Sequence, residues 1–233
     1  MSLLTIVQDA ADRLSIPEPI SAFTSSDTSI RELVGLAQQE GKELARRASW
    51  QSLTKEKTFT TTAAAVQTSA VPSDFDWYIP GTAFNRTRRR QMVGPLSQSD
   101  WQRIQASLVT LVNPGFRFRG DDILITPTPA AGETVAYEYV TLNWCTSIGG
   151  TPQSSWQFDS DVAVLDEELI TLGLIWRFKK TNGFDYSEEF RSYDMQVTKA
   201  ILRDGALPFL STNLTPVART PTSPLIPDTI VFS

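Results

Sequence analysis

The run LDEELITLGLIWRFKKTNGFDYSEEFRSYDMQVTKAILRDG, residues 165–205, decides the fold class. Apolar residues recur at helical spacing from Leu165 to Trp176, after acidic residues that suit a helix N-terminus. Asn182-Gly183 is a typical helix stop. A second stripe at helical spacing runs from Tyr186 to Ile201. Because the connection between them is short, the sequence predicts two antiparallel helices.

Two further helices are predicted near the N-terminus. The first covers residues 3–14, where Pro17 and Pro19 follow and end it. The second begins after the capping oxygens of residues 27–29 and carries an apolar stripe from Ile30 to Ala48. Most polar residues of this segment, Glu40 among them, lie off that stripe. Helix pairs this short are not stable separately, so we expect both pairs to pack together as one bundle.

The middle of the chain has the signature of β-structure. Strand-like runs flank the turn at Gly120, which predicts a hairpin over residues 116–125. Alternation with a period of two predicts a strand over 135–143, and residues 146–160 are expected to be a loop. The predicted fold class is α+β: a helical bundle built from N- and C-terminal helix pairs, with an inserted β-rich domain and an extended C-terminal tail. The predicted boundaries are 1–53 and 161–205 for the two halves of the bundle, 54–160 for the β-rich domain and 206–233 for the tail.

The tail combines five prolines with many apolar residues and only two charges. Proline prevents a helix from propagating through it, and a free disordered tail would be more polar. One interpretation is docking onto another subunit or another protein, and the alternative is folding back onto its own domain. Extended at roughly 3.3 Å per residue, it could reach on the order of 80 to 90 Å. The predicted docking residues are Leu207, Phe209, Leu210, Leu214, Val217, Leu225, Ile226, Ile230, Val231 and Phe232.

Composition bears on the chemistry open to this chain. Its 233 residues contain no histidine, which excludes serine–histidine and cysteine–histidine catalysis. Cys145 is the single cysteine, so an intrachain disulfide is impossible and structural zinc is not expected. The net charge of −5 argues against a dedicated nucleic-acid binder. No signal peptide and no apolar run of about 20 residues is readable, so we expect no membrane association and synthesis in a reducing cytoplasm.

The densest charge cluster has three interpretations. Stacking groups at Phe84 and Trp77 would suit nucleic acid, a solvated loop needs no partner, and an inter-subunit contact would match the cluster with acids of a neighbour. The cluster consists of Arg86, Arg88, Arg89 and Arg90.

Acidic residues between 159 and 168 raise the question of a cation site. Asp159 and Asp161 precede the acids of residues 166–168, but the glycine and terminal glutamate of a calcium loop are missing. Helix capping explains these acids better. No cofactor, metal or catalytic residue is predicted, and the chain is not expected to be an enzyme.

The order and spacing of several short motifs resemble the head-to-tail adaptor (connector) proteins of tailed bacteriophages, as in short-tailed phages. The likeness covers most of residues 3–204. The motifs are VPSDF (71–75), NRT (85–87), VGPLS (93–97), DWQ (100–102), FRFRG (116–120), ITPTPAAG (125–132), LGLIWRF (172–178) and GFDY (183–186).

This resemblance implies a homo-oligomeric ring, usually dodecameric, bound beneath the portal protein in the virion. Such a ring extends the DNA channel, through which DNA passes without specific binding, and presents a platform for a tail or neck protein such as a nozzle or tail hub. The helices would build the ring wall, and the tail over 206–233 would grip the portal, with Ile230-Val231-Phe232 able to add a strand to a sheet edge.

Two other classes of protein remain open on the sequence. One is another neck or tail ring protein, such as a stopper or tail tube. The other is a glycan-binding or hydrolytic tail module, which would need paired acids in a cleft.

Overall fold

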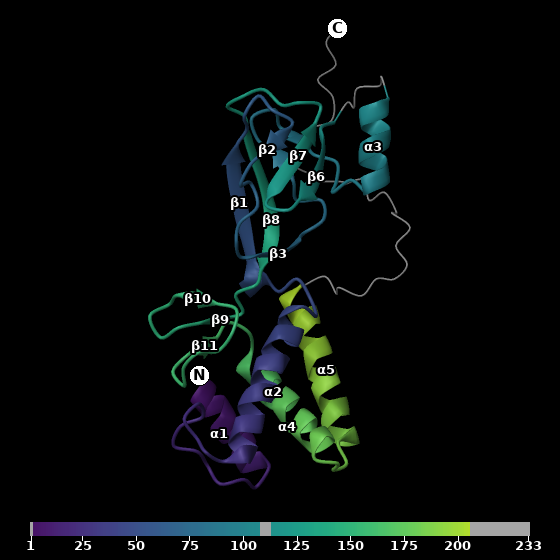
Figure 1. Ribbon diagram of the computed structural model, residues 1–233. Helices are drawn as coiled ribbons and strands as arrows, with labels where there is room; N and C mark the ends of the chain where they lie inside the picture. Colours follow the sequence, from purple (N-terminus) through teal and green to yellow (C-terminus); the bar gives the residue numbers. More distant parts are fainter. Residues whose placement is uncertain (1, 108–112, 206–233) are drawn as a thin grey trace.

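The computed structural model describes residues 2–107 and 113–205, and these confirm the predicted α+β class. Figure 1 shows α1, α2, α4 and α5 gathered at one end of the molecule and the larger sheets at the other, with α3 beside the sheets. The helices are α1 (Leu3–Arg13), α2 (Thr28–Ala45), α3 (Gln98–Ala106), α4 (Glu167–Thr181) and α5 (Ser187–Asp204). None of the helices in the described ranges is both long enough and apolar enough to cross a membrane.

The helix ends follow local sequence signals. The Asp27 carboxylate accepts a hydrogen bond from the Ser29 amide at 2.8 Å and caps α2. Asp166 caps α4 in the same way, with its carboxylate 3.1 Å from the Glu168 amide. Gly205 ends α5 with φ of 72°, a left-handed conformation in which glycine carries no steric penalty.

Helix α4 is the centre of the helical layer. It is buried along most of its length, and it contacts α1, α2 and α5. A helix that is apolar around its whole circumference belongs inside a core. Helices α1, α2 and α5 each bury one face against it, because their apolar residues are confined to one stripe. The packing therefore places α1 and α5 on two separate faces of α4.

The β region holds two antiparallel sheets. The first has the order β1-β8-β4-β5, with β3 also paired to β8, and the second has the order β2-β7-β6. The predicted hairpin at Gly120 is the pair β6 and β7. The strands of the first sheet are β1 (Thr54–Thr60), β3 (Phe75–Tyr78), β4 (Phe84–Asn85), β5 (Arg90–Gln91) and β8 (Thr134–Thr141). Those of the second are β2 (Val66–Gln67), β6 (Gly115–Arg119) and β7 (Asp122–Thr126).

An aromatic cluster joins these two sheets. Tyr78 on β3 lies edge-on to Phe116 on β6, with ring centroids 5.4 Å apart. Tyr137 on β8 contacts Phe118 on β6 in a similar geometry at 5.9 Å. Edge-to-face aromatic pairs of this kind add to the burial of apolar area. The β region thus has a core of its own, separate from the core of the helices.

The expectation of a loop over residues 146–160 is wrong in part. Strands β9 (Cys145–Thr146), β10 (Pro152–Gln153) and β11 (Val162–Ala163) form a small third sheet. Beside it, Trp144 and Trp156 pack perpendicular to each other with centroids 4.9 Å apart, and both belong to the helical core. Strands of two residues carry too little periodicity to be read from sequence.

Candidate assembly surfaces

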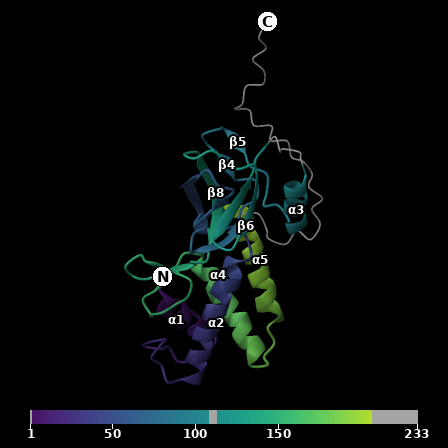
Figure 2. The ribbon, with the colours of Figure 1, turned by 45° about the horizontal axis from the view of Figure 1, so that its top comes forward.

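The arginine cluster lies on the β4–β5 hairpin, at the end of the β region far from the helices (Figure 2). Its four side chains do not line the same hollow. Arg86 and Arg89 line one hollow of about 600 Å³, whereas Arg88 and Arg90 line a second one of about 140 Å³. The four side chains therefore do not present a single cationic patch.

Two of the arginines are held by acids of the same chain. Arg86 forms an ion pair with Glu56 on β1. Arg88 donates through Nε to Oε1 of the buried Glu133 at 2.6 Å, and Asn85 donates to the other oxygen of Glu133 at 2.6 Å. Burial alone would raise the pKa of Glu133, but the hydrogen bonds from Asn85 and Arg88 outweigh it and the pKa is lowered. Arg88 is accordingly a structural residue of the hairpin.

Arg89 is the member best placed to meet another molecule. It is exposed, has φ of 55°, and no acid in the described ranges pairs with it. Phe84 lies on the same hollow, with its ring partly exposed. Trp77, the other stacking group considered for nucleic acid, packs against the helical core instead. The pair needed for base stacking is thus not brought together.

The predicted docking residues of the tail, Leu207 to Phe232, lie outside the described residues. The end of α5, from which the tail continues, is fixed. Asp204 accepts a hydrogen bond from the Gln51 amide at 2.9 Å, three residues before β1 begins. The chain therefore leaves the helices where they meet the β region (Figure 1).

The acids before α4 hold loops together, which corrects the expectation that they cap helices. Asp159 accepts from the Ser21 hydroxyl at 2.5 Å and from the Phe23 amide at 2.9 Å. Asp161 is buried and accepts from the amides of residues 157 and 158 at 2.6 and 2.9 Å. Only Asp166 acts as a cap. Across residues 2–107 and 113–205, no group of three or more potential ligands could hold a metal ion.

Cys145 is fully buried within the helical core. Burial, with the nearby charge of Asp161 as a smaller cause, raises the pKa of its thiol to about 12. Since the thiolate is the reactive form, this cysteine serves packing.

A buried ionic network was missed by the sequence analysis. Glu40, expected off the apolar stripe of α2, is 0% exposed and accepts from Arg177 Nε at 2.6 Å and from the Tyr193 hydroxyl at 2.5 Å. Arg177 also donates to Glu43 at 2.6 Å. Burial raises the pKa of Glu40, and the bonds from Tyr193 and Arg177 oppose that rise. A signal existed, because residue 40 is in phase with the buried Leu33, Ala37 and Leu44.

The charged groups described above bind loops, helices and a hairpin of the same chain to one another. The chain belongs to the SU10 adaptor protein family, whose sequence model matches residues 1–208. Family membership confirms the resemblance to phage head-to-tail adaptors and makes the chain a structural protein of a phage particle. A comparison with curated proteins gives no match.

Proposed function

We propose that this chain is the subunit of a head-to-tail adaptor ring that binds the portal protein, extends the DNA channel and provides a platform for a tail or neck protein. The observation that carries the proposal is the family match over residues 1–208, which spans the helices and the β region together. The chain would thus act as one unit in the neck of the virion, without a catalytic step.

Within such a ring we assign a role to each part of the chain. The helices of residues 1–53 and 161–205 act as one bundle and build the wall, while residues 54–160 project from it as an inserted domain. Separate cores for the helices and for the two larger sheets support this division, whereas Trp144, Cys145 and Trp156, within 54–160, pack into the core of the helices. The tail, residues 206–233, docks on the portal, since apolar extended segments gain most when a partner receives them.

Electrostatics favours a conduit over a DNA-binding surface. The net charge of the whole chain is −5, and a channel that binds phosphates tightly would hold the DNA that it must pass. Two members of the arginine cluster, Arg86 and Arg88, are paired with Glu56 and Glu133. Their charge is therefore largely compensated within the subunit.

Reconstitution with the portal protein of the same phage tests this function. Purified chain is mixed with portal rings, and the complex is isolated by gradient sedimentation and imaged. The proposal expects a closed ring of this chain on the face of the portal that points away from the capsid. Portal rings that stay bare at micromolar chain concentration would contradict it.

A further inference from the structure

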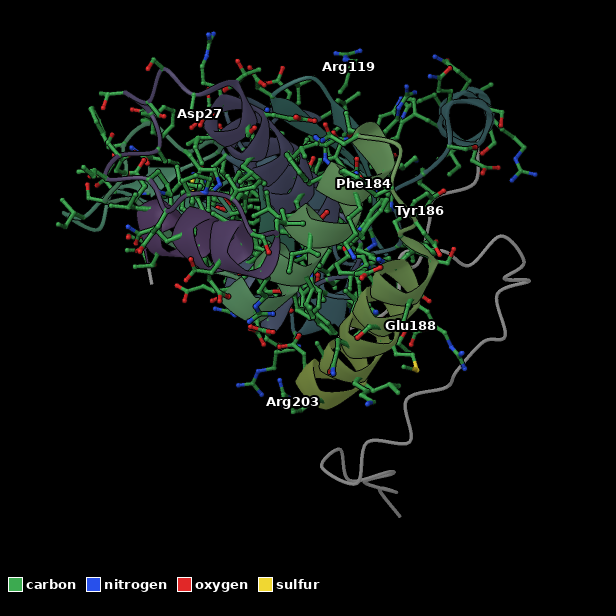
Figure 3. All side chains as sticks on the ribbon, turned by 90° about the horizontal axis from the view of Figure 1, so that it is seen from below. Asp27, Arg119, Phe184, Tyr186, Glu188 and Arg203 are labelled. Atoms are coloured by element: carbon green, nitrogen blue, oxygen red, sulfur yellow. The ribbon has the colours of Figure 1, made fainter. Side chains whose placement is uncertain are left out.

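Helices α1 and α5 lie on opposite sides of the helical layer, with α2 and α4 between them (Figure 2). The view from below agrees: α1 lies on one side, and α5, marked by Glu188 near its start and Arg203 near its end, lies on the other (Figure 3). Each subunit thus has two separate flanks, and each flank carries apolar residues that no described residue covers.

The α5 flank consists of Arg191, Met195, Lys199 and Leu202. Met195 and Leu202 are seven residues apart, so they lie on one face of the helix, opposite the buried Tyr193, Val197 and Ala200. Their exposed fractions are 49% and 77%. Arg191 and Lys199 are exposed beside them and have no acidic partner within the described ranges. Glu188, seven residues before Met195, is an exposed acid on the same face, so this flank is apolar with a basic excess at Arg191 and Lys199.

The α1 flank consists of Asp12, Glu18, Ile20, Phe23 and Phe158. Ile20 is 96% exposed, Phe158 is 63% exposed and Phe23 is also exposed. Asp12 and Glu18 are exposed too, and they have no cationic partner in the part of the chain that the structure describes. This flank is therefore apolar and acidic.

Hydrogen bonds hold the α1 flank in shape. The Asp159 carboxylate accepts from the amides of Ala22 and Phe23, which fixes Phe158 and Phe23 on adjoining loops. The Gln8 side chain donates to the carbonyl oxygen of Pro19 at 2.9 Å and ties the same loop to α1. Apolar side chains on a prearranged loop lose less entropy on binding than those on a free loop.

We propose that the α1 flank of one copy binds the α5 flank of the next copy, and that this contact closes the ring. The proposal rests on the proposed function and names the surfaces that such a ring would use. A closed ring needs two different, complementary faces on each subunit. The two flanks match in both respects: each contributes apolar area, and the acids of one face the bases of the other.

Cross-linking between single-cysteine variants tests the pairing directly. Cys145 is buried, so the native chain provides a background with low thiol reactivity. Ile20→Cys and Leu202→Cys are made as separate chains and assembled on portal rings, alone or as an equal mixture, and treated with a short bis-maleimide. The mixture is expected to give dimers linked between positions 20 and 202, and each variant alone is expected to give none.

A charge placed on one flank provides a second test. Met195→Glu puts an acid on the basic, apolar flank and is expected to lower the affinity between subunits about tenfold or more, because a central apolar contact is lost. Val93→Glu is the matched control, since Val93 is also 49% exposed but lies in the β region. This control is expected to assemble like the native chain, and both variants are expected to keep the native Tm.

The outcomes separate this inference from the proposed function. If the mixed variants form rings on the portal but give no 20–202 cross-link, the pairing is overturned and the adaptor function stands. Links between two copies of position 20 would overturn it as well, because they show a symmetric contact. A link from position 202 to a cysteine of the portal would overturn the pairing, because it would assign the α5 flank another occupant. If the native chain does not join the portal, both proposals fall.

Discussion

Gly173 on α4 lies directly against the side chain of Glu40 on α2. A Cβ atom at position 173 would lie 2.3 Å from the Cδ atom of Glu40, well inside van der Waals contact. The absence of a side chain at this point lets the two helices approach while Glu40 remains buried and bonded to Arg177 and Tyr193. A carboxylate in the core is thus accommodated by a glycine on the neighbouring helix.

Gly173→Ala is expected to destabilise the fold by about 1–3 kcal/mol, as overpacking of a tight core does. Intrinsic helix propensity alone would favour alanine by about 1 kcal/mol. Gly35→Ala is the matched control, because Gly35 lies on the exposed side of α2 with nothing within 4 Å of the added Cβ. Urea unfolding of both variants checks this, and a stabilising Gly173→Ala would contradict the close approach.

Arg177→Met is expected to cost about 3–5 kcal/mol, since it leaves the charge of Glu40 buried without its partner. The ion pair between Arg103 and Asp100 on α3 is exposed, so Arg103→Met is expected to cost less than about 1 kcal/mol. Chemical denaturation of the two variants compares these costs. Equal losses would show that the Glu40 network does not support the core.

Asp74 gives a prediction on pH. Burial would raise its pKa, but hydrogen bonds from Lys55 at 2.8 Å and from Thr141 and Tyr139 at 2.9 Å hold the pKa below its ordinary 3.8. A lowered folded-state pKa stabilises the protein above 3.8, and this contribution is lost as the pH falls through the folded-state value. The stability difference between the native chain and Asp74→Asn should therefore shrink on acidification. A difference that grows at low pH would reverse the sign.

Charge reversal within the arginine cluster separates folding from assembly. Arg88→Glu would set two carboxylates against each other at Glu133, so we expect a lower Tm. Arg89→Glu should leave the Tm unchanged. If the cluster meets an acidic neighbour, Arg89→Glu weakens ring or portal assembly at physiological salt. Unchanged assembly of this variant would remove the cluster from the interface.

Truncation after Asp204 tests the role assigned to the tail. The truncated chain retains the hydrogen bond between Asp204 and Gln51, and we expect it to unfold at the native Tm. It should no longer join the portal, because the apolar residues assigned to docking are gone. Portal binding at native affinity by the truncated chain would refute that role.

The helices were predictable because each carries its own signal. Buried stripes mark α2 and α5, aspartate caps mark the starts of α2 and α4, and glycines stand at the ends of α4 and α5. The hairpin at Gly120 was predictable for the same reason. Such local signals act over one or two turns, so the sequence reveals them directly.

Features that depend on distant residues were not predictable. Burial of Glu40 requires Gly173 and Arg177, which lie more than a hundred residues away in the chain. The role of Asp159 as a loop anchor depends on the loop at residues 21–23. Pairing of Arg88 with Glu133 needs the register of β4 on β8. In each case the deciding partner becomes a neighbour only after folding.

The most direct test of the adaptor assignment is the mass of the complex formed when the full-length chain meets intact portal rings, measured by native mass spectrometry. We predict one discrete species in which a whole ring of subunits has been added to each portal. Portal rings that keep their own mass at saturating chain concentration would contradict the assignment.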